Sequence, residues 1–191
     1  MKILFCGVGA LGSHVIYLTH GLEADRSAID FDRVETKNLA SQWFVKAMVG
    51  KNKATAVKLQ MQNFFGVRVH DLTNRLTETN VETLLSDMDL VVDGFDNAAS
   101  RRLVQDMVRK ESIPCVHGGL AADGAFGVVR WDEAFVIDEE DVPGQATCDG
   151  GQFLPMINMV ASALAESIQQ FKGKQLRLNW NVSPKGAECF R

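Results

Sequence analysis

The sequence is poor in the residues that mark secreted or disordered chains. Its 191 residues include only 4 prolines, 4 cysteines and 1 tyrosine. So few prolines, beside 46% hydrophobic and 23% charged residues, exclude a disordered, collagen-like or coiled-coil chain and indicate a globular protein. The cysteines lie far apart and form no CxxC pair, so the sequence indicates neither a disulfide framework nor a four-cysteine zinc site. We therefore expect a cytoplasmic protein.

An excess of basic residues is also missing. The net charge is -4, and the 20 lysines and arginines are spread along the chain, which disfavours nucleic acid as a partner. The apolar run over residues 3–22 is interrupted by glycines and by His14 and His20, so we expect neither a signal peptide nor a membrane span. This run instead predicts a buried strand, a turn and a helix.

Strands and helices alternate along the chain. We expect strands at residues 2–6, 27–31, 67–70, 90–93, 114–117, 125–131 and 176–182. We expect a helix that residues 7–13 lead into and that ends at about residue 18, and further helices at about residues 52–64, 81–88, 97–110 and 153–171. The alternation predicts a single Rossmann-like α/β domain over residues 1–191, with a mostly parallel sheet and helices on both faces. Ligands of such sheets bind at the carboxyl ends of the strands.

A glycine-rich motif, Gly7-x-Gly9-x-x-Gly12, follows the first expected strand and opens a helix. Its glycines allow a tight turn and let backbone N–H groups approach a phosphate at the positive end of the helix. Asp30 closes the second expected strand, where an acidic side chain can bind ribose hydroxyls. Taken alone, this pattern favours a dinucleotide cofactor, so one interpretation is an NAD(P)-dependent oxidoreductase.

Three further segments extend the pattern, and a fourth precedes the last helix. They read IDFDRVETKNLASQ at residues 29–42, GKNKA at 50–54, DGFDN at 93–97 before Arg101, and TCDGG at 147–151. In this order they resemble the motifs DxDxVexsNLxRQ, GxxKA, DxxDNxxxR and CxxxG of the ThiF/MoeB/HesA family and of ubiquitin-activating enzymes, with the last spacing one residue shorter here. The resemblance extends from Gly7 to about Phe171.

Members of this family adenylate a carboxylate, usually that of the terminal glycine of a ubiquitin-like protein, by attack on the α-phosphate of ATP. The resemblance therefore implies an ATP- and magnesium-dependent adenylyltransferase that acts on a ubiquitin-like sulfur-carrier protein or a related peptide. It also implies a homodimer. Such a transfer needs positioning and charge neutralisation more than covalent chemistry from the protein.

The resemblance also assigns roles to individual residues. Asp30 would bind the ribose hydroxyls, and Asn38 and Lys53 would bind the phosphates. Asp96 would bind the magnesium ion. The implied cofactor-binding residues are Gly7, Gly9, Gly12, Asp30, Asp32, Asn38, Gln42, Lys53, Asp96 and Asn97. Catalytic roles would belong to Lys53, Asp96 and Cys148, whose thiolate near a helix N-terminus could attack the acyl-adenylate.

Three features depart from the family pattern. Ser41 stands where the family has an arginine that approaches the ATP phosphates. The chain begins at the strand before the glycine turn, without the helix that lends an arginine to the neighbouring subunit in many relatives. The paired zinc cysteines of many relatives have no counterpart. A non-catalytic nucleotide-binding module of the same fold therefore stays open as an alternative.

Several residues also have a purely structural interpretation. Lys53 could be an exposed helix lysine, Asn38 a turn residue, and Asp96 with Asn97 only a helix cap. The acidic segment 132–151 could be a solvated linker or a loop over the site. The helix at 153–171 could be fully buried or could supply a dimer surface. We expect Cys6, Cys115 and the four histidines to have no functional role.

Overall fold

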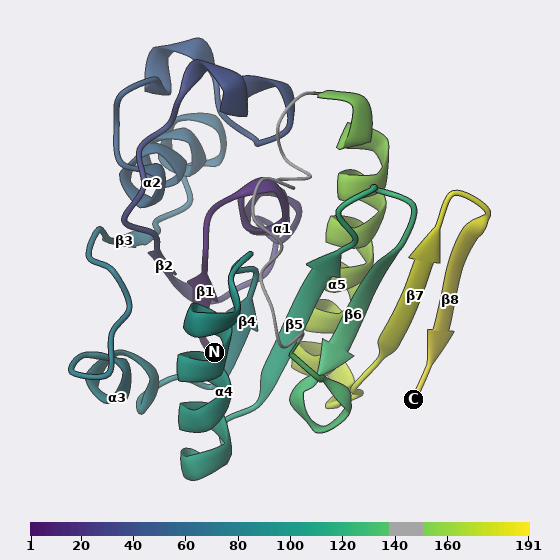
Figure 1. Ribbon diagram of the computed structural model, residues 1–191. Helices are drawn as coiled ribbons and strands as arrows, with labels where there is room; N and C mark the ends of the chain where they lie inside the picture. The colour runs from purple at the N-terminus through teal and green to yellow at the C-terminus, as the bar shows by residue number, and fades with distance from the viewer. Residues whose placement is uncertain (138–150) are drawn as a thin grey trace.

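The computed structural model describes residues 1–137 and 151–191, and these residues form one sheet of eight strands (Figure 1). The strands are β1 (Lys2–Cys6), β2 (Asp25–Ile29), β3 (His70–Leu72), β4 (Leu90–Asp93), β5 (Cys115–Leu120), β6 (Gly127–Trp131), β7 (Asn179–Ser183) and β8 (Gly186–Phe190). Their order is β3-β2-β1-β4-β5-β6-β7-β8. Pairs from β3 to β5 are parallel and pairs from β5 to β8 are antiparallel.

Helices cover both faces of this sheet. They are α1 (Ala10–Leu18), α2 (Lys53–Phe65), α3 (Val81–Leu85), α4 (Ala98–Glu111) and α5 (Leu154–Lys174), with short 3-10 turns η1 (Thr36–Ala40), η2 (Lys46–Met48), η3 (Asp132–Ala134) and η4 (Gly151–Phe153). One hydrophobic cluster joins α1, α2 and α5 to the sheet, and a second joins α3 and α4 to the opposite face (Figure 1). The predicted α/β Rossmann-like fold is confirmed.

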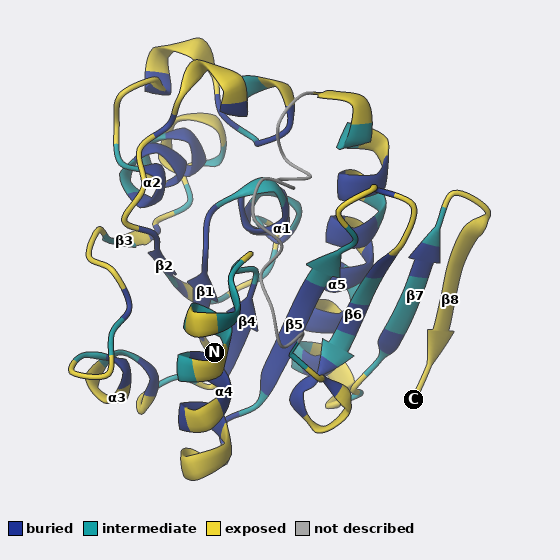
Figure 2. Ribbon diagram, in the orientation of Figure 1, coloured by how far each residue is buried: buried dark blue, intermediate teal, exposed yellow. Residues whose placement is uncertain are grey.

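The first strand, β1, contributes apolar side chains to both faces of the sheet. Ile3 and Phe5 point into the cluster with α1, α2 and α5, whereas Leu4 and Cys6 point into the cluster with α3 and α4. Alternate residues of a strand face opposite sides, so a central strand covered on both faces is apolar throughout. Burial of each such side chain stabilises the fold by about 1.5 to 3 kcal/mol. Figure 2 shows the buried residues concentrated in the central strands of the sheet.

Several expected elements need correction. The strand expected at residues 27–31 covers Asp25–Ile29, and the strand expected at 67–70 is the short β3, His70–Leu72. The last expected strand covers Asn179–Ser183, and β8 was not expected at all. All five residues of β8 are exposed, so this strand depends on pairing with β7 and has no buried face that the sequence could reveal (Figure 2).

The long helix α5 is a core helix. Ile157, Val160, Leu164 and Ile168 are fully buried, and the helix packs against α1 and β5. The chain itself therefore covers its apolar face, which is not a free surface for a dimer. Across the residues that the structure describes, none of the helices combines the length and apolar character needed to cross a membrane.

Candidate functional site

The carboxyl ends of β1, β2 and β4 meet at the glycine turn. The backbone N–H of Gly7 donates to the carbonyl of Ile29 over 2.9 Å, and that of Gly94 donates to the carbonyl of Cys6 over 2.8 Å. Gly7 has a φ of +84°, and a Cβ there would lie 3.0 Å from the ring of Phe95. The turn therefore requires glycine at this position and packs closely against the loop that follows β4.

Gly9 and Gly12 differ in what surrounds them. A Cβ on Gly12 would lie only 1.9 Å from the carbonyl oxygen of Gly7, so the protein's own packing requires this glycine. A Cβ on Gly9 would have nothing within 4 Å. Gly9 directly precedes α1, where backbone N–H groups point out of the helix. Packing does not explain this glycine, and the open space beside the helix end leaves room for a phosphate to approach.

This difference gives a matched pair of variants. Gly12→Ala should destabilise the fold by about 1 to 3 kcal/mol, because the new methyl group collides with backbone. Gly9→Ala should change stability by less than about 0.5 kcal/mol, because its surroundings are open. We expect Gly9→Ala to weaken nucleotide binding by about tenfold or more. Chemical denaturation and calorimetric titration with ATP measure the two effects, and equal behaviour of the two variants would contradict this assignment.

Asp30 follows β2 at the edge of the same turn. Its side chain is almost fully buried, and its two carboxylate oxygens accept hydrogen bonds from the N–H groups of Val8 and Asp32, both over 2.8 Å. Burial raises the pKa of Asp30, and the charge of Lys53 and these two N–H groups partly offset the rise. A carboxylate held this way beside the glycine turn lies where Rossmann-like folds bind ribose hydroxyls.

Lys53 is held in the site by the start of α2. Asn52 caps this helix by accepting from the N–H of Thr55, and its amide donates to the carbonyls of Asp30 and Asp32. The Lys53 ammonium lies 3.1 Å from a carboxylate oxygen of Asp32, and the residue is only 8% exposed. The interpretation of Lys53 as an exposed helix lysine is therefore wrong.

The electrostatic environment of Lys53 connects three parts of the site. Burial alone would lower the pKa of Lys53, but the carboxylates of Asp30, Asp32 and Asp96 outweigh it and raise the pKa. Lys53 is thus a buried cation that stays protonated at neutral pH. A buried cation surrounded by carboxylates is suited to bind a phosphate chain together with a metal ion that offsets its charge.

Asp96 and Asn97 follow β4 and have separate environments. Asp96 is exposed, whereas Asn97 caps α4 by accepting a hydrogen bond from the N–H of Ser100 over 2.9 Å. The helix-cap interpretation is therefore correct for Asn97. Residues 1–137 and 151–191 contain no group of three or more His, Cys, Asp or Glu residues that could hold a metal. Magnesium still fits, because it is commonly bound by one or two carboxylates and the phosphates of a substrate.

The remaining expected residues lie beside η1. The side-chain carbonyl of Asn38 accepts from the N–H of Glu35 over 2.8 Å, so Asn38 does shape a turn. Gln42 is 6% exposed, and its buried Oε1 has no hydrogen-bond partner among the residues that the structure describes. Ser41, at the family's arginine position, is fully buried. Cys148 lies outside the described residues, as does most of the acidic segment, so both stay predictions.

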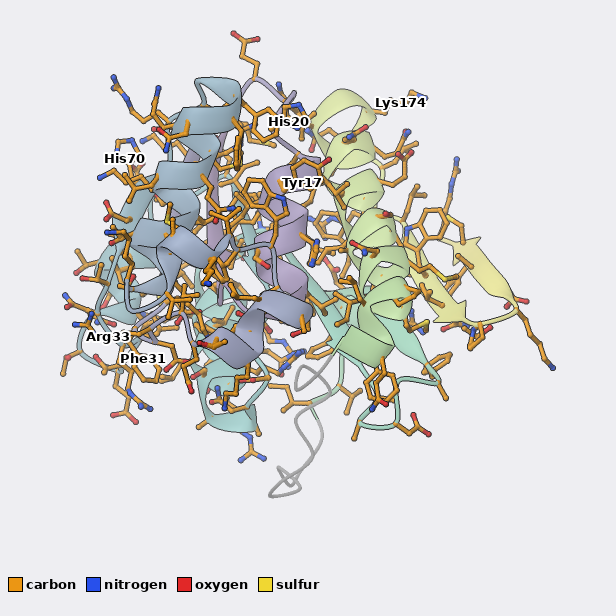
Figure 3. All side chains as sticks on the ribbon, turned by 90° about the horizontal axis from the view of Figure 1, so that it is seen from above. Tyr17, His20, Phe31, Arg33, His70 and Lys174 are labelled. Carbon is orange, nitrogen blue, oxygen red and sulfur yellow. The ribbon has the colours of Figure 1, made fainter. Side chains whose placement is uncertain are left out.

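The structure reveals one surface feature that the sequence analysis missed. Phe31 lies between Asp30 and Asp32, is 42% exposed, and has the guanidinium of Arg75 3.9 Å from its ring centroid. Figure 3 shows Phe31 beside Arg33 on the outside of the molecule. An exposed aromatic ring of this kind, next to the acid expected to bind ribose, has the shape to stack on a base. Its position between two aspartates was the available signal, but nothing in the sequence brought Arg75 to it.

A glycine turn that opens the first helix of a parallel sheet, with an acid at the end of the next strand, defines the Rossmann-like class of nucleotide-binding folds. The chain belongs to the ThiF family, which matches residues 1–179. The resemblance seen in the sequence motifs is thereby confirmed.

Curated relatives include adenylyltransferases. The chain is 31% identical over 191 residues to the adenylyltransferase and sulfurtransferase UBA4 of Lodderomyces elongisporus, covering 94% of this chain and 42% of that protein. It is 34% identical over 122 residues to the sulfur carrier protein adenylyltransferase of Thermus thermophilus, covering 62% and 45%. The chain thus spans less than half the length of these relatives.

Solved structures share the fold. The E. coli protein MccB, solved with ATP, superposes with a TM-score of 0.77 at 19% identity, covering 99% of this chain and 62% of that one. The structure of PaaA gives a TM-score of 0.75 at 15% identity, covering 100% and 63%. At these identities the likeness establishes the fold alone.

Proposed function

We propose that this protein is an ATP-dependent adenylyltransferase that activates the C-terminal carboxylate of a ubiquitin-like sulfur-carrier protein or a related peptide. The observation that carries the proposal is the buried ammonium of Lys53 beside Asp30, Asp32 and Asp96. The names of its relatives, which include adenylyltransferases and a sulfur-carrier-activating enzyme, support the same activity.

In the proposed reaction, a carboxylate oxygen of the substrate attacks the α-phosphorus of ATP. The bond from this phosphorus to the oxygen that leads to the β-phosphate breaks, so pyrophosphate leaves and an acyl-adenylate remains. The turn at Gly9 and the cation of Lys53 would bind the phosphates, while Asp30 would orient the ribose. Bound magnesium, held through Asp96, would offset the phosphate charge. Positioning and charge stabilisation supply most of the catalysis in such transfers.

The oxidoreductase interpretation fits the turn and Asp30 but gives Lys53 and Asp96 no task. Calorimetric titration of the chain should therefore give binding of ATP with magnesium at least about tenfold tighter than binding of NAD or NADP. Labelled pyrophosphate exchange into ATP, with a ubiquitin-like carrier present, then tests the reaction. Tight NAD binding that Lys53→Ala leaves unchanged would favour the oxidoreductase. ATP binding without exchange would favour the non-catalytic module.

We further propose a cytoplasmic homodimer, on the resemblance to the family. Cys6 and Cys115 are buried free thiols, which suits a reducing compartment. Because the chain covers the apolar face of α5 itself, another surface would form the dimer contact. A monomer at micromolar concentration in light scattering would contradict the dimer.

A further inference from the structure

A buried histidine lies beneath the candidate site. The parallel pairing of β4 with β5 places Asp93 opposite His117, and both residues are fully buried. Nδ1 of His117 lies 2.8 Å from a carboxylate oxygen of Asp93. Nε2 of the same ring lies 3.2 Å from a carboxylate oxygen of Asp132, in η3. One imidazole therefore joins two carboxylates from different elements.

This geometry favours a positively charged ring. A neutral imidazole has one N–H donor and one acceptor nitrogen, so one of its nitrogens would face a carboxylate without a proton. Both contacts are attractive only when His117 is an imidazolium. The ring of Phe135 stacks on His117, with centroids 4.1 Å apart and planes 5° from parallel, and shields it from water.

The pKa shifts agree with this charge. Burial would lower the pKa of His117, but its hydrogen bonds to Asp132 and Asp93 outweigh burial and raise the pKa. Burial would raise the pKa of Asp132, but hydrogen bonds from His117, Arg109 and Gln105 lower it to about 2. Both shifts favour the charged forms of the pair, an imidazolium at His117 and a carboxylate at Asp132. The favourable contribution of this pair is lost as the pH rises through the raised pKa of His117, or falls through that of Asp132.

Other polar groups complete the surroundings of the ring. Arg101 and Arg109 come from α4, where Arg101 lies 3.7 Å from Asp93 and Arg109 lies 2.8 Å from Asp132. The thiol of Cys115 lies 3.4 Å from Nε2 of His117. Burial raises the pKa of Cys115, which therefore stays neutral beside the ring. Within residues 1–137 and 151–191, the polar groups that face His117 or its partners are Asp93 from β4, Asp132 from η3, Cys115 from β5, Cys6 from β1, and Arg101, Gln105 and Arg109 from α4.

Asp93 transmits the position of His117 to the loop that carries Asp96. The second carboxylate oxygen of Asp93 accepts a hydrogen bond from the N–H of Phe95 over 3.0 Å. On the other side of Asp96, Asn97 is fixed as the cap of α4. The backbone of Asp96 is thus held between two anchored neighbours, and one anchor depends on the orientation of Asp93.

We propose that His117 is a positioning residue for the adenylation site: as an imidazolium clamped between Asp93 and Asp132, it fixes the loop 93–97 and so orients Asp96. The inference rests on the proposed function, because Asp96 matters only if the site binds magnesium with ATP. His117 itself touches no reacting group. Its effect on the reaction passes through Asp93.

The charge of His117 can be measured without any activity. In the full chain labelled with nitrogen-15 histidine, the His117 signals are assigned by their loss in His117→Gln. We expect both ring nitrogens to be protonated at pH 7.5, with the exposed His70 as a comparison in the same spectrum. A single protonated nitrogen would overturn the proposal. If wild-type protein shows no pyrophosphate exchange, the proposed function fails while this measurement still stands.

The positioning role is tested by the pH profile of Asp132→Asn. This variant removes one carboxylate from His117, so the ring should lose its proton at a lower pH. At each pH the exchange rate of Asp132→Asn is divided by the wild-type rate. We expect this ratio to be about tenfold lower at pH 8.5 than at pH 6. Arg109→Gln is the control, because it removes a partner of Asp132 that does not touch His117, and its profile should parallel wild type. A profile of Asp132→Asn that is lowered equally at every pH would overturn the positioning role.

Discussion

Lys53→Ala should reduce ATP–pyrophosphate exchange by about 100- to 1,000-fold, the usual loss when one preorganised charge is removed from a transition state. Lys53 is buried at the start of α2, and the raised pKa keeps it charged at neutral pH. A phosphate chain bound beside the glycine turn would therefore lose the buried cation at the start of α2. The measurement is the rate of labelled pyrophosphate incorporation into ATP at saturating magnesium.

A lysine from the same helix serves as the control. Lys58 lies on α2 and pairs with Asp71 over 2.7 Å, with 45% of its side chain exposed. Lys58→Ala should change the exchange rate less than about twofold, because a surface pair contributes little. If Lys53→Ala exchanges pyrophosphate as fast as Lys58→Ala, Lys53 does not belong to the catalytic machinery.

Asp96→Ala should lower exchange by about 100-fold or more and remove its response to magnesium. The side chain is exposed after β4, so its loss should change the free energy of unfolding by less than about 0.5 kcal/mol. Activity measured against magnesium concentration, together with a denaturation curve, separates these two effects. Asp106→Ala, an exposed aspartate on α4, should leave both unchanged. Normal magnesium-dependent exchange by Asp96→Ala would remove Asp96 from the site.

The parts of the fold that the sequence predicted well carry strong local signals. The strand at residues 90–93 has the expected limits because its apolar run is buried on both faces. Asn97 begins α4 because its side chain can accept from the N–H of Ser100, a local interaction. Among the strands with shifted or missed limits, β3 has only three residues and β8 is exposed throughout, so for these two the pairing partners rather than their own residues determine where they begin and end.

The residues of the candidate site also differ in how well the sequence predicted them. Asp30 and Lys53 belong to motifs with recognisable spacing, so their approach at the end of the sheet could be expected. His117 could not be connected to Asp93 and Asp132, because only the register between β4 and β5 and the position of η3 bring them together. The histidine was expected to have no functional role, and its burial agrees with a structural one. Its contacts with two carboxylates are the observation that indicates a positioning role as well.

The position of β1 in the middle of the sheet has a consequence for synthesis on the ribosome. This strand is made before both of its neighbours and pairs with β2 soon afterwards, but its other neighbour is β4. The glycine turn packs against Gly94 and Phe95, which follow β4. These contacts of the glycine turn therefore cannot form until residue 95 has left the exit tunnel. Until β4 pairs with it, one edge of β1 is unpaired, and a chaperone or a neighbouring chain could occupy that edge.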